Sequence, residues 1–133
     1  MLTITIDREL ADAVYVQVAS QMRLLIASGA ISPGTPIPSV RQLSRDLGVS
    51  LNTIARAYRM LEEEGFLVIR DRAGVTVAAP AEEIGEPVRL ALLDELRTIL
   101  ARLQQAGIAN DELLRTLQRE VGALDVRRRG ERS

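Results

Sequence analysis

Two short helical patterns separated by only two residues place the strongest constraint on how this chain can fold. The first pattern has apolar residues at helical spacing, namely Val40, Leu43 and Leu47. Ser39 and Gln42 form an S-x-x-Q capping box at its start, and Gly48 ends it. The second pattern covers residues 51–64, and Ser50 can cap it. Two helices this close together around a glycine-containing turn predict a helix-turn-helix.

The segments around this pair predict a small domain. Residues 13–28 show the periodicity of an amphipathic helix, and residues 3–7 alternate like a short strand. Residues 32–38, SPGTPIP, predict a rigid turn because three prolines and a glycine fall within seven positions. The β-rich runs 66–70 and 74–78 predict a hairpin. Helices followed at once by such a hairpin form a winged helix.

Beyond the hairpin, the pattern changes to two further helices. Apolar residues recur at helical spacing from Ile84 to Leu103, after a linker or helix entry. Asn110 is expected to cap a last helix, whose apolar residues run from Leu113 to Leu124. We therefore expect a mainly α fold (small α+β) with two domains. Residues 1–78 form the winged helix-turn-helix, and residues 79–133 form the linker and a two-helix dimerisation hairpin.

Composition excludes several classes of function. The chain has neither cysteine nor histidine, so we expect no disulfide, no zinc site and no Ser-His or Cys-His nucleophile. Glu62–Glu64 are consecutive, so on a helix their side chains diverge and cannot converge on one ion. We predict no enzyme activity, no metal and no cofactor. Without a signal-like N-terminus or an 18-residue apolar run, the expected location is the cytoplasm.

Charge is distributed unevenly although the net charge is only −1. All 17 basic residues are arginines, and residues 41–60 hold four of them against one acid. On the helix over residues 51–64, Asn52, Arg56 and Arg59 lie opposite the inward-facing Ile54. Taken alone, this pattern also fits a solvated helix face. In a helix-turn-helix it indicates DNA reading, because Asn pairs with adenine and Arg with guanine in the major groove.

The stretch from Tyr15 to Leu67 resembles the DNA-binding domain of the GntR family of bacterial transcription regulators. The matching pieces occur in family order: PSVRQL, LGVS, NTIARAY and EEGFL. The part after Ala78 is similar to the YtrA-type subfamily, which carries two helices where other members carry a ligand-sensing domain. The resemblance implies a sequence-specific regulator, of the repressor kind, that binds a near-palindromic operator as a homodimer. It places the helix over residues 51–64 in the major groove.

The expected DNA-contacting residues lie in the helix-turn-helix and the wing: Ser39, Arg41, Ser50, Asn52, Thr53, Arg56, Arg59, Arg70, Arg72 and Gly74. In the family, the arginine matching Arg41 reaches the operator. Ser39 and Ser50 can cap helices and also present backbone N–H groups to phosphate. For Thr53, a second capping hydroxyl and a phosphate contact are both open.

The wing departs from the family pattern R-x-G-x-G-T. Here Arg72 replaces the first glycine and Val75 the threonine, while Gly74 remains. Minor-groove insertion is therefore not carried over from the family. For Arg70 and Arg72, a DNA contact and a soluble hairpin edge are both open. The arginine-rich tail after Val126 is expected to be a solubilising end.

The last two helices have apolar faces that need a partner. The expected dimer interface consists of Val88, Leu92, Leu96, Ile99, Leu103, Leu113, Leu117 and Val121. The alternative is a monomer whose helical hairpin packs on the wing domain. A different function, a winged helix that only associates with proteins, would require an apolar patch on the outward face of residues 51–64. A small-molecule effector is left open, since the C-terminal helices offer little room for a pocket of about 300 Å³ unless the dimer interface supplies it.

Overall fold

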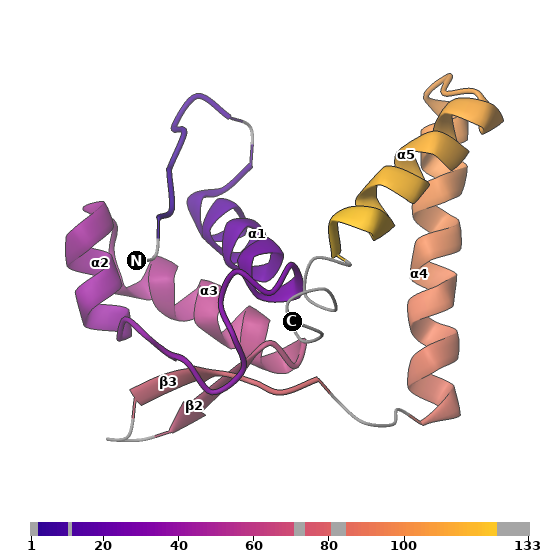
Figure 1. Ribbon diagram of the computed structural model, residues 1–133. Helices are drawn as coiled ribbons and strands as arrows, with labels where there is room; N and C mark the ends of the chain where they lie inside the picture. The colour runs from indigo at the N-terminus through magenta and orange to yellow at the C-terminus, as the bar shows by residue number, and fades with distance from the viewer. Residues whose placement is uncertain (1–2, 11, 71–73, 81–84, 125–133) are drawn as a thin grey trace. The chain divides into compact units, whose positions relative to one another are not determined.

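The computed structural model describes residues 3–10, 12–70, 74–80 and 85–124, which form two compact units with a boundary after Pro80 (Figure 1). The elements are α1 (Val14–Ala27), β1 (Pro36–Ile37), α2 (Val40–Leu47), α3 (Leu51–Glu63), β2 (Leu67–Arg70), β3 (Gly74–Val77), α4 (Glu86–Gln105) and α5 (Asn110–Leu124). The fold is mainly helical, with a winged helix-turn-helix followed by two helices that contact each other. The predicted fold class is confirmed.

The core of the first unit lies between α1, α2, α3 and a three-stranded antiparallel sheet of order β1-β3-β2. Helix α3 buries one face against it, with residues spaced at three and four positions: Ile54, Ala57, Tyr58 and Leu61. Helix α1 packs along α3 and contributes Val18, Ala19, Met22 and Ile26. The chain has a single phenylalanine, so aliphatic side chains and Tyr58 fill this core.

The predicted starts of α2 and α3 and the predicted end of α2 at Gly48 are confirmed, whereas α3 ends at Glu63, one residue before the predicted Glu64. The Ser39 hydroxyl oxygen accepts a hydrogen bond from the Gln42 backbone N–H at 3.1 Å, which is the first half of the predicted capping box. Ser50 does the same for Thr53 at 3.2 Å. Gly48 adopts the left-handed conformation, with φ of 65°, so the chain can turn directly from α2 into α3. These local signals fix the helix-turn-helix.

The predicted turn over residues 32–38 is wrong in part, because its end forms strand β1. Pro36 and Ile37 pair with Thr76 and Val75 of β3, and Ile37 is buried. The Val77 N–H donates to the Thr35 carbonyl at 3.0 Å, next to this pairing. A proline lacks a backbone N–H, so it fits a strand at the edge of a sheet. Its presence therefore did not exclude a strand.

The predicted strand over residues 3–7 is also wrong, since this extended segment pairs with none of the described strands. Two glutamine side chains of α1 form the hydrogen bonds that a neighbouring strand would form with this segment. Gln21 accepts from the Thr5 N–H at 2.9 Å and donates to the Thr5 carbonyl at 2.6 Å. Gln17 accepts from the Asp7 N–H at 2.9 Å and donates to the Asp7 carbonyl at 2.9 Å. The segment is thereby held along α1, and Ile4 is buried in the core.

The second unit consists of α4 and α5, which pack on each other. Asn110 was predicted to cap α5, but the helix already begins at this residue. The Asn110 side-chain oxygen instead accepts a hydrogen bond from the Gln104 amide at 2.7 Å, across the connection between the helices. The Asn110 oxygen thus bonds a side chain of α4 and links the two helices. Ile84, the predicted first residue of the apolar pattern, lies outside the described residues.

Tyr58 links α3 to the start of α2. Its side chain is fully buried, and its hydroxyl donates a hydrogen bond of 2.6 Å to the Pro38 carbonyl. Burial raises the pKa of the Tyr58 hydroxyl above its usual value, so the group remains a donor at neutral pH. Since Pro38 directly precedes the α2 cap, this bond fixes where α2 begins relative to α3.

We expect Tyr58→Phe to lower the free energy of unfolding by about 1–3 kcal/mol, because it leaves the Pro38 carbonyl without its donor. Urea denaturation measures this loss, and an unchanged m-value would show that the unfolding reaction is the same. Tyr15→Phe is the matched control, since it removes a hydroxyl from a half-exposed tyrosine of the same unit. Equal losses in the two variants would contradict a special role for the Tyr58 bond.

Candidate nucleic-acid interface

Helix α3 presents a polar face to solvent. Asn52, Arg56 and Arg59 are exposed, whereas Ile54 and Tyr58 on the other side are fully buried. The structure thus places the three predicted contact residues of α3 on one exposed helix surface. Amide and guanidinium groups supply hydrogen-bond donors and acceptors of the kinds that match base edges. We call Asn52, Arg56 and Arg59 the α3 polar face.

The start of α3 carries two hydroxyl groups that contact each other. The Ser50 oxygen accepts from the Thr53 N–H, and the two side-chain oxygens lie 2.8 Å apart. Ser50 is exposed and Thr53 is half-buried. Of the two interpretations of Thr53, a role at the cap therefore has a direct contact behind it. Contact with phosphate stays a prediction for both residues.

The remaining predicted residues lie in α2 and the hairpin. Ser39 and Arg41 are exposed at the first turn of α2. Arg70 is exposed at the end of β2 and pairs with Gly74, the first residue of β3. Gly74 has φ of 86°, a conformation that explains why a glycine stands at this point of the wing. Arg72 and the arginine-rich tail lie outside the described residues.

Two residues near the α3 polar face were not identified from the sequence. Leu51, the first residue of α3, is 47% exposed, and apolar groups at such a position can contact a thymine methyl group. The guanidinium carbon of Arg56 lies 3.9 Å from the ring centroid of Tyr15. The sequence does contain a signal for Leu51, because a large apolar residue stands at the first position of a helix, next to the predicted contact residue Asn52. The Tyr15 contact joins positions 41 residues apart and leaves no local signal.

The acidic run at the end of α3 has structural partners. Glu64 forms an ion pair with Arg23 of α1 at 2.7 Å, and Glu62 accepts a hydrogen bond from the Ile69 N–H at 3.3 Å. Among the described residues, no group of acidic side chains is arranged to hold a metal ion. None of the described helices combines the length and the apolar character needed to cross a membrane.

The residues expected at a dimer interface fall into two groups. Exposed ones have 43–62% of their surface accessible: Val88, Leu92, Leu96, Ile99 and Val121. Leu103 and Leu117 are half-buried, and Leu113 is buried within a single chain. Leu113 is therefore not part of an exposed surface. We define the α4 apolar stripe as Val88, Leu92, Leu96 and Ile99.

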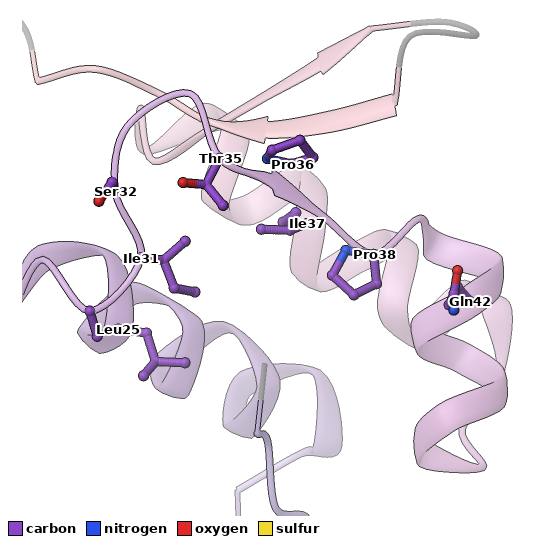
Figure 2. Close-up of a pocket in the computed structure, with 9 residues that line it drawn as sticks. Leu25, Ile31, Ser32, Thr35, Pro36, Ile37, Pro38 and Gln42 are labelled. Atoms are coloured by element: carbon purple, nitrogen blue, oxygen red, sulfur yellow. The ribbon is translucent and has the colours of Figure 1, made fainter. Parts of the chain in front are cut away.

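A pocket of about 590 Å³ lies in the first unit, between the end of α1 and the start of α2 (Figure 2). Its walls are mainly Leu25, Ile31, Ile37 and Pro38, with polar atoms from Gln42 and neighbouring hydroxyls. The sequence indicates room for a pocket of this size only at a dimer interface. The pocket in the first unit is not predicted, because most of its walls come from residues 32–38, the segment whose composition predicts a turn.

The family comparison agrees with this geometry. The sequence profile described as "Bacterial regulatory proteins, gntR family" matches residues 14–77. The structure of YtrA from Sulfolobus acidocaldarius, "a GntR-family transcription factor", is 34% identical and has a TM-score of 0.63. That match covers 77% of this chain and 97% of the other.

Two further relatives bear on the two units. The "HTH-type transcriptional repressor YtrA" of Bacillus subtilis is 28% identical over 83% of this chain and 85% of its own length. The AraR DNA-binding domain, solved in complex with operator ORX1, is 30% identical with a TM-score of 0.52. The match covers 58% of this chain and 96% of the AraR domain.

Curated relatives of this chain differ widely in length. The chain spans 84–88% of the short ones and 14–21% of the long ones. The winged helix-turn-helix unit with its exposed α3 polar face, the profile match and the similarity to YtrA agree. The chain belongs to the GntR family, in its YtrA-type branch, and is a DNA-binding transcription regulator rather than an enzyme.

Proposed function

We propose that this protein is a repressor that binds a near-palindromic operator as a homodimer, with α3 in the major groove. The observation that carries the proposal is the α3 polar face, an amide and two guanidinium groups exposed on a capped helix. The second helix of a helix-turn-helix enters the major groove and contacts bases from its N-terminal part. Asn52 and Arg56 lie in that part of α3.

The roles we propose follow from position and chemistry. Asn52 and Arg56 read bases, while Arg41, at the first turn of α2, anchors the phosphate backbone. Further backbone contacts come from Ser39, Ser50, Thr53 and Arg59, and wing contacts from Arg70, Arg72 and Gly74. Arginine is the only basic residue type in the chain, and its planar fork suits both bases and phosphates.

Dimerisation is supported by the α4 apolar stripe. Monomeric proteins rarely expose contiguous apolar surface, and a second copy of the same helix would cover this one. One recognition helix contacts only a few base pairs, so two helices held at a fixed separation would supply the specificity that one lacks. A two-fold dimer matches a near-palindromic site.

Repression is supported by the Bacillus subtilis relative, which is a transcriptional repressor. The match covers 85% of the length of that repressor. DNA recognition by the unit is supported by the AraR domain, solved with an operator. The alternative function, protein association through α3, requires an apolar patch there. The outward side of α3 instead carries polar side chains, the α3 polar face and Glu63, and Leu51 is the one exposed large apolar residue of this helix.

Arg56→Ala is expected to weaken operator binding by about 1–3 kcal/mol and to relax the preference at one base pair. Arg41→Ala should weaken binding to all sequences alike, because a phosphate contact carries no sequence information. Selection of bound DNA from a random pool measures both effects. If Arg56→Ala leaves affinity and preference unchanged, the base-reading role is wrong.

Ser50 allows its two proposed roles to be separated. Ser50→Ala removes the cap of α3 and should cost about 1 kcal/mol of unfolding free energy. Ser50→Asp keeps a capping oxygen and should retain most of the stability, but its negative charge would repel a nearby phosphate. We expect tight binding to be lost in Ser50→Asp despite normal thermal unfolding. Unchanged affinity would place Ser50 away from the DNA backbone.

Leu96→Arg should split the dimer, because it places an unpaired charge in an apolar contact. Leu90→Arg is the matched control. Leu90 is similarly exposed, but it stands two positions from Leu92 and so lies about 200° around the same helix. Light scattering at micromolar concentration distinguishes the two variants. A dimeric Leu96→Arg, or a monomeric Leu90→Arg, would contradict an interface on the α4 apolar stripe.

A further inference from the structure

The contact between Tyr15 and Arg56 connects the core of the first unit to the α3 polar face. Tyr15 stands in the first turn of α1 and is partly buried against the core cluster. Arg56 is exposed on α3, and its guanidinium carbon lies over the Tyr15 ring, 3.9 Å from the centroid. This separation is well inside the range in which an arginine is attracted to an aromatic face. The packing of Tyr15 thus fixes the ring on which Arg56 rests.

The chemistry of this contact leaves Arg56 able to bind DNA. A guanidinium group stacks through its flat face, whereas its five N–H donors point outward in its own plane. A guanidinium on a ring can therefore still donate two parallel hydrogen bonds to one guanine. An exposed arginine without such support samples many rotamers, and ordering it on binding costs about 0.5–1.5 kcal/mol, equivalent to a roughly two- to tenfold loss of affinity.

We infer that Tyr15 is a positioning residue for DNA recognition, whose ring holds the Arg56 guanidinium in the orientation that reads a base. This inference rests on the proposed base-reading role of Arg56. Tyr15 itself need not touch DNA. Its contribution is to remove, in the free protein, part of the conformational freedom that Arg56 would otherwise lose on binding.

The other end of the same helix pair provides a matched control. Arg23 of α1 pairs with Glu64 at 2.7 Å and also lies 5.9 Å from the ring centroid of Phe66. It thus joins α1 to the end of α3, as the Tyr15 contact joins α1 to an earlier part of α3. The hydrogen bonds of Arg23 go to Glu64 and Met60, neither of which belongs to the α3 polar face. A variant at Arg23 therefore reports what a loosened contact between the helices does to binding without any effect on Arg56.

The first test measures the stack in the full chain before any DNA is added. Proton NMR should show the Arg56 side-chain CH₂ resonances shifted upfield by the ring current of Tyr15. Tyr15→Phe should keep this shift, and Tyr15→Leu should abolish it. Arg56 resonances at ordinary positions in the wild-type protein would overturn the inference, whatever any variant does.

The second test is a double-mutant cycle on the operator obtained by selection from a random pool, with mismatched sites alongside. Tyr15→Leu should reduce discrimination at the base pair read by Arg56 by roughly two- to tenfold, with preferences elsewhere unchanged. Tyr15→Phe, which keeps the ring, should discriminate at this base pair as well as the wild-type protein does. In the Arg56→Ala background, Tyr15→Leu should have no further effect. Arg23→Ala should lower thermal stability and leave the base preference intact.

The outcomes separate the inference from the function on which it rests. If Arg56→Ala changes no base preference, the proposed role of Arg56 fails, and the role of Tyr15 falls with it. If Arg56→Ala relaxes the preference while Tyr15→Leu does not, only the inference is wrong. It is also overturned if Tyr15→Leu has the same effect with and without Arg56, or if it tightens binding, because the ring would then hold Arg56 away from DNA.

Discussion

The buried Tyr58 is the constraint on which the arrangement of the helix-turn-helix depends. Its ring fills the centre of a core that otherwise consists mostly of aliphatic side chains, and its hydroxyl reaches the Pro38 carbonyl. One side chain of α3 therefore holds both the core and the peptide that leads into α2. The polar residues on the opposite side of α3 point outward because Tyr58, Ile54 and Leu61 point inward. Packing of one face thus determines the orientation of the α3 polar face.

Local chemistry made the helix-turn-helix predictable from the sequence. Ser39 and Ser50 cap their helices, Gly48 takes the left-handed conformation, and the apolar spacing of α3 gives its buried face. Each of these signals depends on residues only a few positions apart. The exposed position of Asn52, Arg56 and Arg59 followed from the same spacing, without knowledge of any distant contact.

Features that depend on distant partners could not be predicted. Strand β1 exists because β3 offers it a partner, and nothing within SPGTPIP encodes that. Asn110 is of a residue type that is typical of helix caps, but its side-chain oxygen accepts a hydrogen bond from Gln104 of α4. The Tyr15 contact with Arg56 is of the same kind, since the packing of α1 on α3 brings the two residues together. Residue type and spacing indicated which groups were available, and tertiary contact decided how each was used.

The two glutamines of α1 show how a helix can substitute for a neighbouring strand. Gln17 and Gln21 are four residues apart, a rise of about 6 Å along a helix. Thr5 and Asp7 are two residues apart, about 6.6 Å along an extended chain. The two repeats nearly coincide, so each side-chain amide bonds both the N–H and the carbonyl of a single residue in the segment. An alternating segment near a Q-x-x-x-Q helix can therefore be extended and fully hydrogen-bonded on one edge without belonging to any sheet.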